Sequence, residues 1–131
     1  MSDRELDLSR PLAAGIVNVT VDSMFEGARS GTPERAIEDG LALAAAGFDM
    51  LDVGAVAARS GPPVSAEVEA ASLVPAVAGL VASGLPVSAD TFSATVARRA
   101  LDAGAAIVND ISGGSDEAFE LVAERGCGYV L

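Results

Sequence analysis

Short apolar runs that end in a polar residue recur along this chain, and each run is introduced by a glycine. The three clearest pairs of glycine and terminal polar residue are Gly47 with Asp52, Gly84 with Asp90, and Gly104 with Asn109. A glycine in the left-handed conformation commonly ends a helix, and a short continuous apolar run is typical of a buried strand. Each unit therefore predicts a helix end, a buried strand, and then a polar side chain that packing does not require.

Helix signals fill the intervals between these runs. Thr32 stands before Pro33 and Glu34, and Ser65 and Ser115 stand before acidic residues, which is the pattern of helix N-termini. A further helix is expected after Asp90, beginning near Ser93, and each helix should place one apolar face against the core. The residues predicted to face inward are Ile37, Leu41 and Ala44; Val74, Val77 and Val81; Val96, Ala100 and Leu101; and Phe119 and Val122.

Strand and helix alternate along the whole chain. A first buried strand is expected over 13–19, and a fifth strand begins after Gly126. This βαβα order predicts a parallel sheet with right-handed crossovers. Ligand sites in such folds lie at the carboxyl ends of the strands. The polar residues expected to converge there are Asn18, Asp52, Asp90 and Asn109.

Two architectures fit this alternation, the closed eight-fold barrel and the open doubly wound sheet. No predicted strand is followed by G-x-G-x-x-G, the signature of the open dinucleotide-binding fold. A complete barrel needs eight units and roughly 250 residues, and only four units and the start of a fifth strand are present. The expected fold class is α/β, with parallel (β/α) units of a TIM barrel, first half only. Residues 1–12 are expected to be a lead-in, and residues 13–131 a partial barrel domain.

Composition limits the chemistry that this domain can support. The 131 residues are 50% hydrophobic, which indicates a globular domain with a core of its own. No apolar run reaches 18 residues and the first residues are acidic, so a cytoplasmic protein is expected. With one cysteine and no histidine, His/Cys zinc sites and Ser-His-Asp triads are excluded, and any metal must be a hard ion with oxygen ligands.

The net charge of −11 and the absence of lysine indicate which partners to expect. So acidic a surface repels nucleic acid and anionic membranes, and neither is expected as a partner. An anionic small substrate remains compatible with this charge if a divalent cation or a specific arginine offsets it.

Several motifs, in order along the chain, together resemble those of the dihydropteroate synthase family. They are residues 16–23 (IVNVTVDS), residues 51–54 (LDVG) with Arg59 and Gly61, residues 88–91 (SADT), and residues 107–110 (IVND). That family consists of pterin-binding (β/α)₈ barrels. Its members condense a dihydropterin methyl diphosphate with 4-aminobenzoate in folate biosynthesis, with Mg²⁺ on the diphosphate.

The resemblance implies a role for each matched residue. Asp90 and Asn109 correspond to pterin contacts, and Asn18 corresponds to a Mg²⁺ contact. Asp22 and Ser23 correspond to a loop that closes over the site. Arg59 corresponds to an arginine near the diphosphate and the aminobenzoate, where a planar guanidinium is well suited.

Each of these roles has a simpler alternative. Asp90 and Asn109 could cap strand ends, Asp22 could cap its own turn, and Arg59 could be a solvated surface arginine. Asp52 is interpreted as structural as readily as functional. Asp110 is expected to cap the turn over residues 112–114.

Residues 55–58 depart from the family pattern. The family usually has Gly-Glu-Ser-Thr where this chain has Ala-Val-Ala-Ala, so two hydroxyls and a carboxylate are missing. Three hypotheses therefore stay open: a dihydropteroate synthase, a pterin-binding homologue without that reaction, and a non-catalytic α/β scaffold. The 131-residue chain alone is expected to be inactive and to form homo-oligomers, because a half barrel leaves strand edges unpaired.

Overall fold

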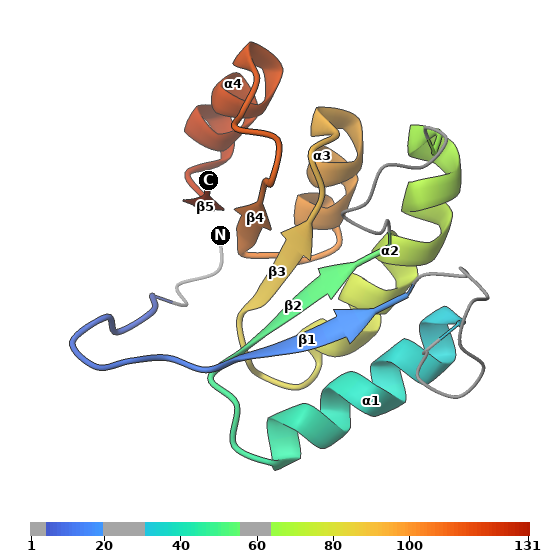
Figure 1. Ribbon diagram of the computed structural model, residues 1–131, viewed down its shortest axis with the longest axis vertical. Coiled ribbons are helices and arrows are strands. Elements are labelled where there is room, and N and C mark those ends of the chain that lie inside the picture. The colour runs from blue at the N-terminus through green and yellow to red at the C-terminus, as the bar shows by residue number, and fades with distance from the viewer. Residues whose placement is uncertain (1–4, 20–30, 56–63) are drawn as a thin grey trace.

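A computed structural model describes residues 5–19, 31–55 and 64–131. Strand and helix alternate through them, and the five strands form one parallel sheet in the order β1-β2-β3-β4-β5 (Figure 1). The elements are β1 (Ala14–Asn18), α1 (Pro33–Ala45), β2 (Met50–Gly54), α2 (Ala66–Val81), β3 (Val87–Asp90), α3 (Ala94–Asp102), β4 (Ile107–Asn109), α4 (Asp116–Arg125) and β5 (Gly128–Val130). The predicted fold class, the first half of a parallel (β/α) barrel, is confirmed.

Each helix begins at the residue that the sequence predicts, but only α4 ends directly at its predicted glycine, since α1, α2 and α3 have the alanine C-caps Ala46, Ala82 and Ala103. The side chains of Thr32, Ser65, Ser93 and Ser115 each accept a hydrogen bond from the backbone N–H three residues later, which satisfies a donor that the helix leaves free. Gly126 closes α4 in the left-handed conformation, with φ of 60°. Gly47, Gly84 and Gly104, which follow the other three helices, also have positive φ.

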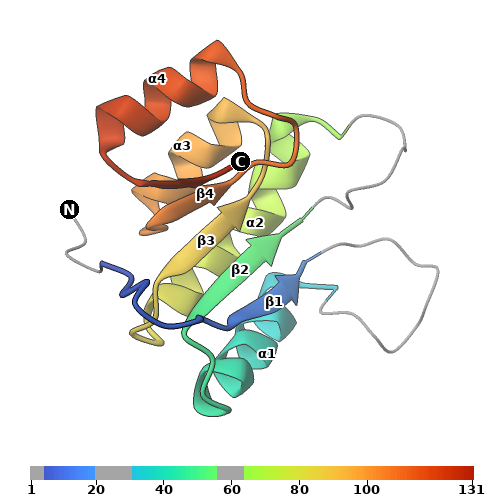
Figure 2. The ribbon, with the colours of Figure 1, turned by 60° about the vertical axis from the view of Figure 1, so that its left-hand side comes forward.

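One face of the sheet packs against the helices, as the two views in Figures 1 and 2 show. Alternate strand residues such as Val17, Val53 and Ala89 point to this side and are fully buried. Leu73 and Leu80 of α2 fill the space opposite them. The remaining strand residues point to the opposite face, and that face carries the candidate site.

The inward faces of two helices differ from the prediction. On α1 the buried residues are Ala36 and Gly40, whereas Leu41 is 42% exposed. Gly40 lets α1 approach α2 closely, since a Cβ there would lie 2.4 Å from Leu80 Cδ2. The residues that face the core are therefore Gly40 and Ala36, one and five positions before Leu41.

On α4 the buried residues are Ala118 and Leu121, and the predicted Phe119 is 46% exposed. The Phe119 ring packs edge-on against the Tyr129 ring of β5, with centroids 6.0 Å apart. Ala118 and Leu121 therefore define the buried face of α4, and Phe119, the largest apolar residue of this helix, lies at its border. Of the other predicted inward residues, Val77, Val96 and Ala100 are fully buried.

Ion pairs connect the outer helices. Arg99 of α3 forms a bidentate pair with Glu67 of α2, with N–O distances of 2.7 and 3.0 Å. Arg98 of α3 forms a similar pair with Glu124 of α4. None of the helices within the described ranges is long and apolar enough to cross a membrane.

Candidate active site at the carboxyl ends of the strands

The pairing register places the predicted polar residues in one row across the sheet. Asn18 pairs with Gly54, Gly54 with Asp90, and Asp90 with Asn109. Residues in register on parallel strands point to the same face. Because their neighbours Val17, Val53 and Val108 are buried on the helix side, this row lies on the opposite face.

Gly54 leaves the space that the Asp90 side chain occupies. A Cβ at this position would lie 3.3 Å from Asp90 Oδ2 and 3.5 Å from Asp90 Cβ. Any larger residue would press on the carboxylate. The glycine therefore allows the acidic side chain to lean across the end of β2.

Asp52 lies inside β2, two residues before the row, rather than at the strand end that the sequence predicted. The strand continues through Val53 and Gly54, so the polar residue falls within the ladder. Its position two residues before Gly54 puts its side chain on the same face as Asp90. It is 8% exposed.

Asp52 and Asn109 contact each other across the intervening strand β3. The side-chain amide of Asn109 donates to Asp52 Oδ2 over 3.0 Å. Because an ionised carboxylate only accepts, the amide nitrogen must face Asp52, and the amide oxygen faces away. Asp52 Oδ1 is buried and has no hydrogen-bond partner within the described part of the chain. The described residues therefore leave one buried acceptor of this site without a donor.

Asp90 lies in an unusually acidic environment. Burial, together with the negative charges of Asp52, Glu69 and Asp110, raises the pKa of Asp90 to about 6. Near neutral pH this carboxylate is ionised, yet it takes up a proton at a higher pH than an ordinary aspartate does. A ligand that brings N–H donors would relieve the repulsion.

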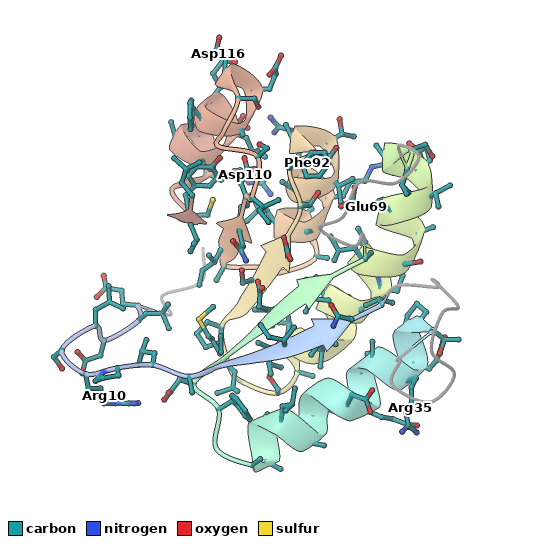
Figure 3. All side chains as sticks on the ribbon, viewed as in Figure 1. Arg10, Arg35, Glu69, Phe92, Asp110 and Asp116 are labelled. Carbon is teal, nitrogen blue, oxygen red and sulfur yellow. The ribbon has the colours of Figure 1, made fainter. Side chains whose placement is uncertain are left out.

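Asp110 has the structural role that the sequence suggested, and a second contact besides. It is 2% exposed and accepts hydrogen bonds from the Ser112 N–H at 2.8 Å and the Ser112 hydroxyl at 2.6 Å. The Tyr129 hydroxyl also donates to it, over 2.6 Å. Burial raises the pKa of Asp110, but these three bonds outweigh it and hold the pKa below the usual value. Figure 3 shows Asp110 beyond the end of β4.

Three of the residues selected from the sequence, Asp22, Ser23 and Arg59, lie outside the described residues. Asn18 is described, exposed at the end of β1, in register with Gly54. Its amide oxygen is a suitable ligand for Mg²⁺, which takes few protein ligands and keeps several waters. Across residues 5–19, 31–55 and 64–131 no group of three acidic, cysteine or histidine residues could hold a metal by itself. The donor set thus fits an ion that shares its ligands with a bound substrate.

A glutamate that the sequence analysis did not select also contributes to this site. Glu69, on α2, is 8% exposed and its charge acts on Asp90. An acidic residue near the start of a helix ordinarily indicates only a favourable interaction with the helix dipole, so nothing in the sequence marked it out.

A parallel (β/α) sheet with carboxylates and an amide at the carboxyl ends of its strands defines a partial barrel of the ligand-binding class. The chain belongs to the pterin binding enzyme family, which matches residues 14–131. The resemblance noted in the sequence is thereby confirmed, and the chain is a homologue of dihydropteroate synthases.

Two curated relatives illustrate the range of the family. The chain is 46% identical over 120 residues to dihydropteroate synthase of Mycobacterium leprae, a match that covers 89% of this chain and 42% of the relative. It is 39% identical over 130 residues to inactive dihydropteroate synthase 2 of the same organism, covering 97% of this chain and 45% of the relative. The chain therefore spans less than half the length of these relatives.

Solved structures agree with the sequence matches. Dihydropteroate synthase of Xanthomonas albilineans with 4-aminobenzoic acid is 41% identical with a TM-score of 0.85, covering 96% of this chain and 47% of that one. The same enzyme in complex with 7,8-dihydropteroate gives a TM-score of 0.81 at 41% identity, with the same coverage of both chains. The sheet described here thus superposes on about half of a dihydropteroate synthase.

Proposed function

We propose that this chain supplies the pterin-binding half of a dihydropteroate synthase. The reaction would condense a dihydropterin methyl diphosphate with 4-aminobenzoate, in the cytoplasm, as a step of folate biosynthesis. The observation that carries the proposal is the group formed by Asp52, Asp90 and Asn109, in which Asp52 Oδ1 is buried without a partner. The solved relatives that contain 4-aminobenzoic acid and 7,8-dihydropteroate support the choice of substrates.

The group has the hydrogen-bonding pattern that a pterin requires. The 2-amino group and the ring N–H of a pterin are donors, and Asp52 and Asp90 offer carboxylate acceptors on one face of the sheet. The Asn109 amide, with its nitrogen on Asp52, offers an oxygen acceptor and a second N–H. Three neighbouring side chains can therefore bind both donors and acceptors along one edge of a heterocycle.

Mg²⁺ and the diphosphate are assigned to the adjacent end of β1. Asn18 would contribute an amide oxygen to the ion, and Arg59 would pair with the diphosphate, as the family resemblance implies. When bound there, Mg²⁺ would supply positive charge opposite the departing diphosphate. Asn18 lies in the same register row as Asp90, with Gly54 between them, so the ion and the pterin would be neighbours.

The chemical work of these side chains is to bind and orient. Asp90 and Asp52 hold the pterin while positive charge develops at its methylene carbon, and two nearby carboxylates favour that charge. Asn109 fixes the orientation of the ring through its bond to Asp52. The amine of 4-aminobenzoate is the nucleophile, so the protein need not supply one.

A second candidate is a pterin-binding homologue that does not catalyse the condensation. Residues 55–58 lack the two hydroxyls and the carboxylate found in the family, and alanines cannot replace their hydrogen bonds to diphosphate or aminobenzoate. Of these four residues Ala55 is described, and it packs against the core. The similarity to an inactive dihydropteroate synthase 2 favours keeping this candidate.

One pair of measurements separates the candidates. The complete gene product is incubated with the dihydropterin methyl diphosphate, 4-aminobenzoate and Mg²⁺, and dihydropteroate is sought by mass spectrometry, while pterin binding is measured by calorimetry. Binding with product supports the synthase, and binding without product supports the second candidate. The absence of both binding and product contradicts both candidates. Where binding occurs without product, Ala57→Ser with Ala58→Thr should raise turnover more than it changes pterin affinity.

A further inference from the structure

Glu69 is a buried acidic residue for which the described residues provide no cation. It is 8% exposed, and none of the ion pairs formed by the described residues includes it. Its partner is the Thr91 hydroxyl, and burial raises the pKa of the Glu69 carboxyl. Glu67, two residues earlier, is exposed and paired with Arg99. Burying a carboxylate away from a cation is costly, and the hydrogen bond with Thr91 is a contact among the described residues that offsets this cost.

Thr91 is the residue through which Glu69 contacts the site. It directly follows Asp90, is 4% exposed, and its N–H donates to the Asn109 carbonyl over 3.0 Å. Its hydroxyl oxygen accepts a hydrogen bond from the Ser93 N–H over 3.2 Å, next to the start of α3. The hydroxyl hydrogen is therefore available for the Glu69 carboxylate. Thr91 thus joins α2, the end of β3, the end of β4 and the first turn of α3.

We propose that Glu69 is a positioning residue that holds the end of β3 through Thr91 and so aims the Asp90 side chain across the site. Figure 3 shows Glu69 between α2 and α3, on the side of the strand ends. Three hydrogen bonds hold Thr91 and so restrict the backbone next to Asp90, whose carboxylate lies beside Gly54. The proposal rests on the proposed function only for the identity of what Asp90 binds.

Glu69 also acts on Asp90 through its charge. Among the described residues, the titratable groups whose charges act on Asp90 are Asp52 from β2, Glu69 from α2 and Asp110 from the end of β4, and all three are acidic. Together with burial they raise the pKa of Asp90 to about 6. Replacing Glu69 with glutamine keeps a group that can bond to Thr91 and removes one of these charges. Geometry and charge can therefore be tested separately.

The test uses carboxyl ¹³C and backbone amide NMR on the complete gene product, without ligand. Glu69→Gln should lower the titration midpoint of Asp90 by on the order of half a pH unit, and should leave the amide signals of Thr91 and Asn109 nearly in place. Glu69→Ala should shift both amide signals. Glu67→Gln removes the same charge from the same helical turn, but at an exposed position, and should leave the Asp90 midpoint unchanged.

An unchanged Asp90 midpoint in Glu69→Gln would overturn the proposal, as would unchanged Thr91 and Asn109 signals in a folded Glu69→Ala. If Glu69→Ala does not fold, the Asp90 midpoints of Glu69→Gln and of its control Glu67→Gln still test the proposal. A pterin titration of the same samples tests the proposed function separately. If wild type binds no pterin, yet Glu69→Gln lowers the Asp90 midpoint, the proposed function is contradicted and the role of Glu69 stays supported.

Discussion

The Asn109 side chain reaches across β3 to donate a hydrogen bond to Asp52, over 3.0 Å, although the two residues are 57 positions apart. The bond satisfies one oxygen of a nearly buried carboxylate, and the other oxygen, Oδ1, is left without a partner among the described residues. Two strands are thus connected on the open face of the sheet, next to Asp90. This face is the one that we propose binds a donor-bearing ligand.

The bond between Asn109 and Asp52 should contribute measurably to stability. Asn109→Ala leaves both oxygens of a buried carboxylate unpaired, and we expect the free energy of unfolding to fall by about 1–3 kcal/mol. Asn18→Ala, in the same register row but exposed, should change it by less than about 0.5 kcal/mol. Urea denaturation of the complete gene product measures both. Equal effects of the two substitutions would contradict the assignment.

Asp90 should reduce stability at neutral pH. Burial and the neighbouring charges raise the pKa of Asp90 to about 6 from an ordinary 3.8. A group whose pKa is raised on folding stabilises the fold at low pH, and this contribution is lost as the pH rises through the folded pKa. Asp90→Asn should therefore be more stable than wild type at pH 7.5, by on the order of 1–3 kcal/mol.

The same comparison at pH 4 provides the control for Asp90, because wild-type Asp90 is then largely protonated in the folded protein. The stability difference between wild type and Asp90→Asn should be much smaller there. Denaturant titrations at the two pH values give the result. A variant that is less stable than wild type at pH 7.5 would show that ionised Asp90 has a cationic partner, and the account of an acidic site would be wrong.

Close packing of α1 on α2 should make Gly40 intolerant of substitution. A Cβ at this position would lie 2.4 Å from Leu80 Cδ2, and Leu80 is fully buried, so its side chain has no space to move into. Overpacking of this kind costs about 1–3 kcal/mol, more than the roughly 1 kcal/mol that alanine gains over glycine in a helix. Gly40→Ala should lower the melting temperature. A higher melting temperature would mean that the two helices are further apart.

The 131 residues expressed by themselves should self-associate. Within the described sheet, β1 and β5 each pair on one side only, and unpaired edges attract other strands. The face opposite the helices also exposes apolar side chains, with Ile16 at 59% and Val130 at 51%. Size-exclusion chromatography with light scattering should give oligomers or aggregates. A sharp monomer peak with a cooperative melt would contradict this prediction.

The sequence was sufficient to predict the order of elements and the row of polar residues, but it could not locate Asp52 or Glu69. Asp90 and Asn109 were found because each stands where an apolar run ends, and a parallel sheet brings such ends together. Asp52 looked like a strand end as well, and only the pairing register shows that β2 continues to Gly54.

Glu69 and Phe119 show a second limit of sequence reasoning. Helical spacing identifies the apolar face of a helix, but contacts with other elements determine which residues of that face are buried. Glu69 is buried next to Thr91, and Phe119 lies partly exposed against Tyr129 of β5. The sequence around Glu69 and Phe119 does not predict either contact, because each contact involves a residue from another element.

The central claim is that Asp90, with Asp52 and Asn109, binds a pterin. Calorimetric titration of the complete gene product with the dihydropterin methyl diphosphate at pH 7.5 tests it most directly. We predict that wild type binds and that Asp90→Asn remains folded but binds about 10- to 150-fold more weakly, as expected for a lost hydrogen bond to a charged group. The exposed control Asp102→Asn should bind like wild type. Equal affinities of Asp90→Asn and wild type, or a wild-type protein that binds no pterin, would contradict the account.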